Sequence, residues 1–251
     1  MPLLDPIARV GEWTWFAARG GLAAIAAVPR PGLWLRPFYT VLVGGLPLAA
    51  VLGLALGAVI WMHTRGLLDR TAGAAELLPT VLAAAVLLEL APIGAGLIVA
   101  SRTGASLGAE LAAMRVGEQV DALELLGVSP MKRLIAPRVL ACVLATPLLH
   151  VVVSAVAIGS GFVAESVGGG ASWVRYQTAV LAELRLPDVV PAGLKTLAFG
   201  WLIGATGCYV GLTARGGSEG VGKAATDSVV ACVLLVLLAD VLLVGLIRVA
   251  V

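Results

Sequence analysis

Five apolar runs, each long enough to cross a lipid bilayer as a helix, constrain this chain more than any other feature. A bilayer core of roughly 30 Å requires about 20 apolar residues in a helix. The runs cover residues 41–62, 77–101, 139–164, 196–214 and 228–247. Charged residues make up only 13% of the 251 positions, about half the usual share in soluble domains. Since the runs lack the alternation of a membrane barrel, we expect an all-α integral membrane protein with five transmembrane helices.

Residues 1–38 differ from the rest because charges interrupt every apolar stretch. Arginines are spread among aromatic and aliphatic residues such as Trp13, Trp15 and Leu22. This pattern predicts a helix that lies in the membrane interface. We expect three prolines to end that helix before the first span: Pro29, Pro31 and Pro37. The chain would then divide into an interfacial helix with its connector, 1–38, and a five-span membrane domain, 39–251.

The Lys and Arg residues are distributed unevenly between the two sides that five spans would create. The N-terminal segment and the expected loops at 102–138 and 215–223 carry 11 of the 17. The opposite side carries six, namely Arg65, Arg70, Arg175, Arg185, Lys195 and Arg248. The positive-inside rule then predicts a cytoplasmic N-terminus and an outward-facing C-terminus. A net charge of +2, without basic stretches among aromatics, excludes a nucleic-acid partner.

The expected 102–138 loop contains a segment, RVGEQVDALELLG at 115–127, with the pattern of a short amphipathic helix. Acidic residues would share one side: Glu118, Asp121 and Glu124. The other side would hold Val116, Val120, Leu123 and Gly127. Gly127 suits a helix C-terminus, and Ser129-Pro130 would stop the helix. Two interpretations remain open, a solvated interfacial helix or a helix that docks on a cytoplasmic partner.

Two carboxylates fall within apolar runs, Glu89 and Asp240. A charged group in the bilayer is costly and needs a partner, a cavity or water. Pro92 follows Glu89 and would free a backbone carbonyl and kink the helix. For both acids, a buried polar partner or a protonated state remains an alternative to a functional site. His150 is expected to be a packed polar group.

The segment GSEGVGKA at 217–224 nearly matches a phosphate-binding loop. However, Ala224 stands where a hydroxyl would bind Mg²⁺, and a membrane span precedes the segment in place of a strand. We therefore expect a tight turn and no nucleotide site. The sequence has two histidines, no carboxylate cluster with metal-ligand spacing and no serine elbow. We expect no enzyme activity, no metal and no cofactor on this chain.

Small residues recur at helical spacing along the apolar runs. Glycines share a helix face in three sets: Gly53 and Gly57; Gly104 and Gly108; Gly200, Gly204, Gly207 and Gly211. Such faces let helices approach closely in lipid, either within the chain or across a dimer. The three cysteines, Cys142, Cys208 and Cys232, are expected to be small buried hydrophobes.

Several separated motifs resemble one known family. They are ELAP at 89–92, SRTG at 101–104, AELAAMRVGEQVDALELLGVSP at 109–130, Pro137-Arg138, and the stretch 199–230 that begins FGWLIGATG, with Asp240 near the end. In order and content these motifs resemble the MlaE/YrbE permease family. The resemblance covers most of residues 40–250. Two positions depart from the family pattern, since Leu88 replaces a common Arg and Ala91 replaces Gly.

The resemblance implies the permease subunit of an ABC transporter that moves phospholipid or another hydrophobic lipid across the envelope, in the bacterial inner membrane. Implied partners are a cytoplasmic ABC ATPase that holds ATP and Mg, an Mce-domain lipid-binding protein, and a second permease subunit, expected to be an identical copy. The implied ATPase-coupling residues are Arg115, Glu118, Gln119, Asp121, Ala122, Leu123 and Glu124. The implied lipid-cavity residues are Leu46, Leu54, Val59, Glu89, Pro92, Leu97 and Asp240. The alternatives are an ion-coupled secondary transporter using Glu89 and Asp240, or a scaffold with a packed interior.

Overall fold

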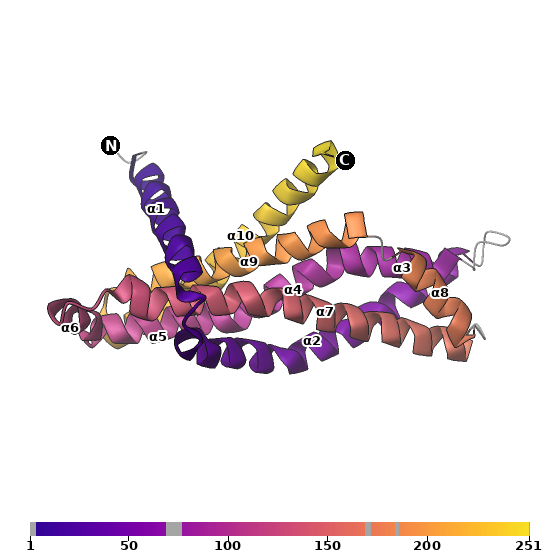
Figure 1. Ribbon diagram of the computed structural model, residues 1–251, viewed down its shortest axis with the longest axis horizontal. Coiled ribbons are helices and arrows are strands. Elements are labelled where there is room, and N and C mark those ends of the chain that lie inside the picture. The colour runs from indigo at the N-terminus through magenta and orange to yellow at the C-terminus, as the bar shows by residue number, and fades with distance from the viewer. Residues whose placement is uncertain (1–3, 69–76, 169–171, 184–185, 251) are drawn as a thin grey trace.

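The computed structural model describes residues 4–68, 77–168, 172–183 and 186–250, and every secondary-structure element within them is helical (Figure 1). In that part of the chain, five helices are long and apolar enough to cross a membrane: Pro31–Leu68, Leu78–Val116, Met131–Gly168, Val189–Leu212 and Gly217–Leu246. The expected all-α membrane architecture with five spans is therefore confirmed.

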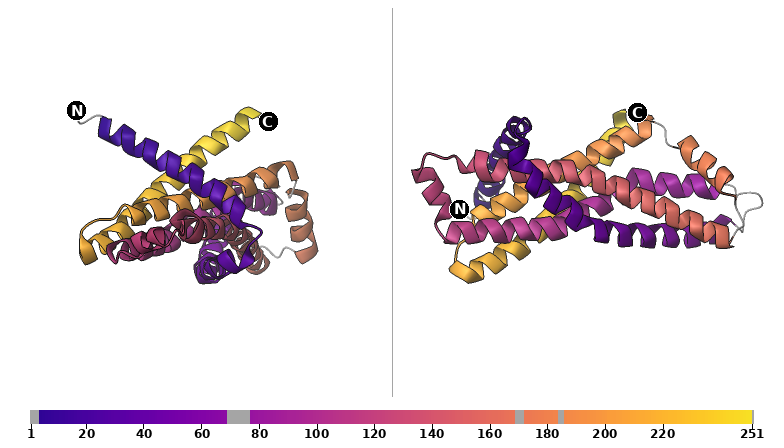
Figure 2. Two further views of the ribbon diagram at one scale, coloured as in Figure 1. Left: turned by 60° about the vertical axis from the view of Figure 1, so that its left-hand side comes forward. Right: turned by 60° about the horizontal axis from the view of Figure 1, so that its bottom comes forward.

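The helices form an elongated bundle (Figures 1 and 2). In chain order they are α1 Leu4–Ala27, α2 Pro31–Leu68, α3 Leu78–Ala85, the π-helical turn η2 Val86–Leu90, α4 Ala91–Val99, the π-helical turn η3 Ala100–Gly104, α5 Ala105–Val116, α6 Gln119–Leu125, the π-helical turn η4 Met131–Ile135, α7 Ala136–Gly168, α8 Trp173–Glu183, α9 Leu186–Leu212 and α10 Gly217–Ala250. The short helix α6 lies at one end of the bundle and α3 and α8 lie at the other (Figure 1). The N-terminal part of α1 and the C-terminal part of α10 project from the bundle on the same side (Figure 1).

The loop expected at 102–138 is mostly helix, so that prediction was wrong. The second span continues without interruption through η3 and α5 to Val116, and the third begins at Met131. Arg102 ends the apolar run, but arginine is a good helix former and does not end a helix. Both spans therefore extend beyond their apolar runs, and α6 lies at the tip of these extensions.

The break between the N-terminal helix and the first span lies at residues 28–30. Pro31 is the first residue of α2, where its missing N–H removes no intrahelical bond. The expectation that Pro37 also breaks the chain was wrong, because Pro37 lies inside α2. The division proposed at residue 38 therefore falls within a continuous helix, and its standing as a domain boundary remains a prediction.

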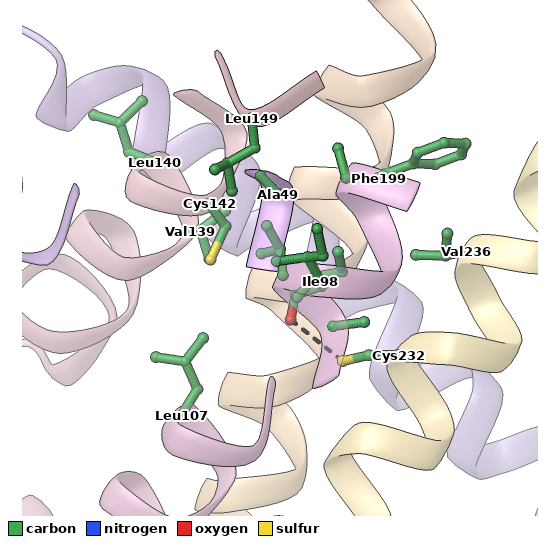
Figure 3. Close-up of a cluster of buried hydrophobic side chains, with 14 of the residues drawn as sticks. Ala49, Ile98, Leu107, Val139, Leu140, Cys142, Leu149, Phe199, Cys232 and Val236 are labelled. Carbon is green, nitrogen blue, oxygen red and sulfur yellow. Dashed lines mark hydrogen bonds between the residues drawn. The ribbon is translucent and has the colours of Figure 1, made fainter. Parts of the chain in front are cut away.

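Helix α7 is the centre of the bundle, with α2 along one side and α9 along another. Its buried residues join those of its neighbours in one hydrophobic core, part of which is drawn in Figure 3. Cys142 and Leu149 of α7 and Ala49 of α2 belong to this core, and the thiol of Cys232 in α10 donates a hydrogen bond to the backbone oxygen of Ile203 at 3.6 Å (Figure 3). All three cysteines are buried and unpaired, as expected.

Glycines set how closely the helices approach. A Cβ at Gly57 of α2 would overlap the carbonyl oxygen of Ala157 and the hydroxyl of Ser160 in α7. A Cβ at Gly200 of α9 would overlap the backbone of Cys142. The other glycines of the three sets also face neighbouring helices of the same chain. Of the two alternatives for these faces, packing within the chain is therefore confirmed.

The end of the bundle opposite α6 is held by a buried acid, Glu165 of α7. It accepts hydrogen bonds from Trp61 Nε1 and Arg65 Nη1 of α2, both at 2.7 Å. Beside it, Tyr176 of α8 donates to the carbonyl oxygen of Ile158 at 3.2 Å. Burial, followed by the negative charge of Glu165, raises the pKa of Tyr176 to about 12.

We predict that Gly57→Ala destabilises the protein by about 1–3 kcal/mol, because the new methyl group meets backbone that cannot move aside. Gly66→Ala is the matched control, since it lies on the same helix and a Cβ there meets nothing within 4 Å. Thermal unfolding in detergent, followed by tryptophan fluorescence, measures both variants. Equal unfolding temperatures for the two would contradict the close α2–α7 approach.

Candidate functional site

A cluster of three charged side chains joins the second, fourth and fifth spans inside the bundle. The Nζ of Lys195 in α9 lies 2.8 Å from Oε2 of Glu89 in η2 and 3.2 Å from Oδ1 of Asp240 in α10. Both contacts are hydrogen bonds as well as ion pairs. For both intramembrane acids, Glu89 and Asp240, the alternative of a buried polar partner is therefore confirmed, because Lys195 pairs with each of them.

The three side chains of this cluster differ in exposure. Lys195 is 3% exposed and Asp240 is 11% exposed, whereas the Glu89 side chain is 45% exposed. With all three ionised, two carboxylates and one ammonium leave one net negative charge. Because a charge in lipid is stable only beside a partner or water, the exposed side of Glu89 is where the cluster can meet a ligand or solvent.

A π-helical turn shapes the backbone around Glu89. The N–H of Ala91 donates to the carbonyl of Val86, five residues earlier. In this pattern the Leu87 carbonyl would accept from residue 92, but Pro92 has no N–H. His150 of α7 supplies the contact, with Nε2 at 3.3 Å from the Leu87 oxygen. The predicted freed carbonyl is therefore present, and His150 is the packed polar group that satisfies it.

Lys195 was placed wrongly by the sequence analysis, which assigned it to the outer loop just before the fourth span. Helix α9 begins at Leu186, so Lys195 lies within the span that covers Val189–Leu212. The run without charged residues begins at Thr196, so Lys195 was assigned to the loop outside the membrane. The sequence did contain a signal for this position. Glu89 and Asp240 lie in apolar runs that contain no Lys or Arg, so a lysine at the edge of another run is the expected cationic partner inside the membrane.

The structure brings together only some of the residues implied to line a lipid cavity. Glu89 and Asp240 share Lys195, and Pro92 is buried next to the same π-helical turn. Leu54 and Val59 are exposed on α2. The remaining two, Leu46 and Leu97, are partly buried. In the single chain the exposed members face outward, so their joint role as a cavity remains a prediction.

The segment predicted as one amphipathic helix is divided by a bend. Helix α5 ends at Val116, and α6 begins at Gln119. Glu118, between them, has a left-handed backbone with φ of 56°, uncommon for a residue with a side chain. Helix α6 ends at Leu125, and Gly127, with a φ of 72°, forms the predicted turn after it. The N–H groups of Gly127 and Val128 cap the carbonyls of Glu124 and Leu123 at 2.9 Å each.

Helix α6 has the two predicted faces only in part, because Val116 and Gly127, predicted on the apolar side, lie outside α6 and are exposed. Val120 is buried and Leu123 packs against the core. The acids are exposed, and Asp121 forms an ion pair with Arg115 at the end of α5. The two most exposed apolar side chains at this end, Leu125 at 90% and Leu126 at 77%, were not among the implied coupling residues. The only signal for them in the sequence was that Leu125 and Leu126 fall outside the one apolar face that α6 needs for packing.

The segment that resembles a phosphate-binding loop does not form one. Gly216 and Gly217 have positive φ angles of 102° and 65° and make the turn after α9. Helix α10 begins at Gly217, so residues 218–224 are helical. The turn expected at this segment is therefore shorter than predicted and ends where the motif begins.

The chain matches one family model and several curated proteins along most of its length. The family model for Permease MlaE matches residues 34–246. The chain belongs to the MlaE permease family. A probable ABC transporter permease protein of Rickettsia typhi is 34% identical over 224 residues, covering 88% of this chain and 86% of that protein. This MlaE-family chain is thus an ABC transporter permease and a multi-pass membrane protein, and the family implies a cytoplasmic ATPase partner.

Two further relatives broaden the family. A probable ABC transporter permease protein of Synechocystis is 35% identical over 168 residues, covering 67% of this chain and 64% of that protein. The protein TRIGALACTOSYLDIACYLGLYCEROL 1, chloroplastic, of Arabidopsis thaliana is 37% identical over 163 residues, covering 65% of this chain and 47% of that protein. Proteins similar to this chain therefore occur in bacteria and in a plant.

We predict that Lys195→Met destabilises the permease by roughly 3 kcal/mol, because it leaves two acids in the membrane without their cation. The triple variant Lys195→Met, Glu89→Gln, Asp240→Asn should recover much of that loss, since it leaves no uncompensated charge. Thermal unfolding in detergent compares the two. A Lys195→Met protein as stable as the parent would show that the cluster does not hold the three spans together.

Proposed function

We propose that this chain is the membrane subunit of an ABC transporter that moves phospholipid or another hydrophobic lipid across a bacterial envelope. A separate cytoplasmic ATPase, which binds ATP and Mg, would drive it. The observation that carries the proposal is the segment around α6, at the tip of two spans. Its acidic side chains and those of Leu125 and Leu126 are exposed. Such a surface suits a partner with an apolar groove and basic rim.

The lipid substrate is supported by the surface and by one relative. Exposed apolar side chains line the outer part of α10: Leu234, Leu237, Leu238, Val241 and Leu242. Leu54 and Val59 are exposed on α2. Two copies that join through these helices would enclose an apolar space with Glu89 at its wall. The Arabidopsis relative carries the name of a galactolipid, which favours a lipid as cargo.

In the proposed assembly the α6 end faces the cytoplasm of a bacterial inner membrane and the C-terminus faces the periplasm. An Mce-domain protein would receive or supply lipid on the periplasmic side. The ion-coupled alternative is less well supported, because Lys195 already pairs with Glu89 and Asp240 and accounts for both acids without a transported ion.

In this mechanism ATP binding closes the ATPase dimer and moves the surfaces that hold the two α6 helices. Each α6 is joined to α5 by the bend at Glu118, and α5 is continuous with the helix that carries Glu89. Movement at α6 therefore shifts the wall of the lipid space. Transport requires only that lipid bind one arrangement of that wall better than the other.

We predict that Leu125→Asp with Leu126→Asp abolishes copurification with the ATPase and lipid-stimulated ATP hydrolysis. Both leucines are exposed, so the folded permease should remain, with an unchanged unfolding temperature. Ser218→Asp is the control, because it adds an acid at the same end of the bundle, where the first turn of α10 tolerates one. Full ATPase binding by the double variant would contradict the docking role of α6.

A further inference from the structure

A groove of about 610 Å³ lies between the start of α2, the η3–α5 segment and the start of α7. Its lining includes four arginines, Arg36, Arg102, Arg133 and Arg138. None of the residues implied to line the lipid cavity belongs to it. The groove is therefore a feature of the bundle separate from that cavity.

The groove carries an excess of positive charge. Arg138 is neutralised, because its Nη2 lies 2.6 Å from Oε1 of Glu110, the acid that also lines the groove. Among the described residues, no carboxylate pairs with Arg36, Arg102 or Arg133. Four guanidinium groups and one carboxylate leave three positive charges. Guanidinium groups offer paired donors that fit phosphate oxygens.

The level of the groove in the membrane follows from three apolar runs. Arg36 comes shortly before the run at 41–62, Arg102 follows the last residue of the run at 77–101, and Arg138 precedes the run at 139–164. All three runs therefore end at the groove, which places it at the boundary between the apolar core and the headgroup layer. Apolar side chains complete its wall, including Leu33, Val41 and Leu107.

Gly44 of α2 determines where one of these charges lies. The guanidinium of Arg102 rests against α2 at this glycine, and a Cβ there would overlap its Cζ and both Nη atoms. The absence of a side chain at Gly44 thus lets Arg102 reach across from η3 to α2. Because the overlapping atoms are the end of a flexible side chain, an alanine at this position would displace the guanidinium and leave the fold intact.

We propose that this groove binds the phosphate of a glycerophospholipid headgroup in the leaflet on the α6 side. Arg36, Arg102 and Arg133 hold the phosphate oxygens, and the hydroxyls of Thr40, Thr103 and Ser106 line the same space. The acyl chains extend along the apolar part of α2, where Val43 and Leu48 are exposed. A lipid fits this position better than an acidic protein does, because the groove lies where headgroups lie. That the leaflet is the cytoplasmic one rests on the proposed function.

The test measures lipid retention by the purified permease without its ATPase. The protein in detergent is mixed with equal amounts of phosphatidylglycerol and digalactosyldiacylglycerol with the same acyl chains, and bound lipid is counted by native mass spectrometry. The parent should retain phosphatidylglycerol in preference. Arg102→Gln should weaken this retention about tenfold, the loss expected for one charge-assisted hydrogen bond. Gly44→Ala should weaken it as well, although it removes no charge.

Two variants serve as matched controls. Lys132→Gln removes an exposed cation next to Arg133 in sequence but outside the groove, and Gly66→Ala adds a methyl group elsewhere on α2. Both should retain lipid like the parent.

The proposal is overturned if Arg102→Gln binds like the parent, or if Lys132→Gln weakens binding equally. Displacement of the lipid by an equal concentration of inorganic phosphate would also overturn it, because the site would then serve free phosphate. Since the ATPase is absent, failure here leaves the proposed transport function untouched, and failure of ATPase docking leaves this binding measurable.

Discussion

The absence of water from the bilayer core is the constraint on which this structure depends, and the Lys195 cluster is its clearest consequence. No solvent is available there to stabilise a lone charge. Glu89 and Asp240 are therefore tied to Lys195, and three spans are fixed relative to one another by side chains that cannot separate cheaply. The same constraint explains why His150 satisfies the carbonyl that Pro92 leaves free, and why glycines bring helix backbones into direct contact.

The cluster and α6 are connected through one helical run. From Glu89 to Val116 the chain continues as helix without a loop, a distance of roughly 40 Å at the usual rise per residue. Two π-helical turns interrupt its regular geometry, at Glu89 and around Arg102. At each of these turns the run meets charged groups, the Lys195 cluster at the first and the arginine groove at the second. In our account a push on α6 is transmitted along this run to both.

Much of the fold could be predicted from the sequence, because a bilayer imposes length and polarity on every span. The five spans and the turn that Gly127 forms after α6 follow from local patterns. Helix ends outside the membrane could not be predicted, since arginine is compatible with both helix and loop, as α5 shows. The Lys195 partnership could not be predicted either, because it joins residues 106 and 45 positions apart in sequence. Motif resemblance identified α6, whereas the exposure of Leu125 and Leu126 depends on the bend at Glu118 and required the structure.

The most direct test of the central claim is lipid movement in proteoliposomes that contain the permease and its ATPase. A fluorescent phospholipid in one leaflet is followed by its accessibility to a membrane-impermeant quencher. Our account predicts that lipid changes sides when ATP and Mg are added, with no ion gradient across the membrane. Movement that requires an ion gradient and proceeds without ATP would contradict it.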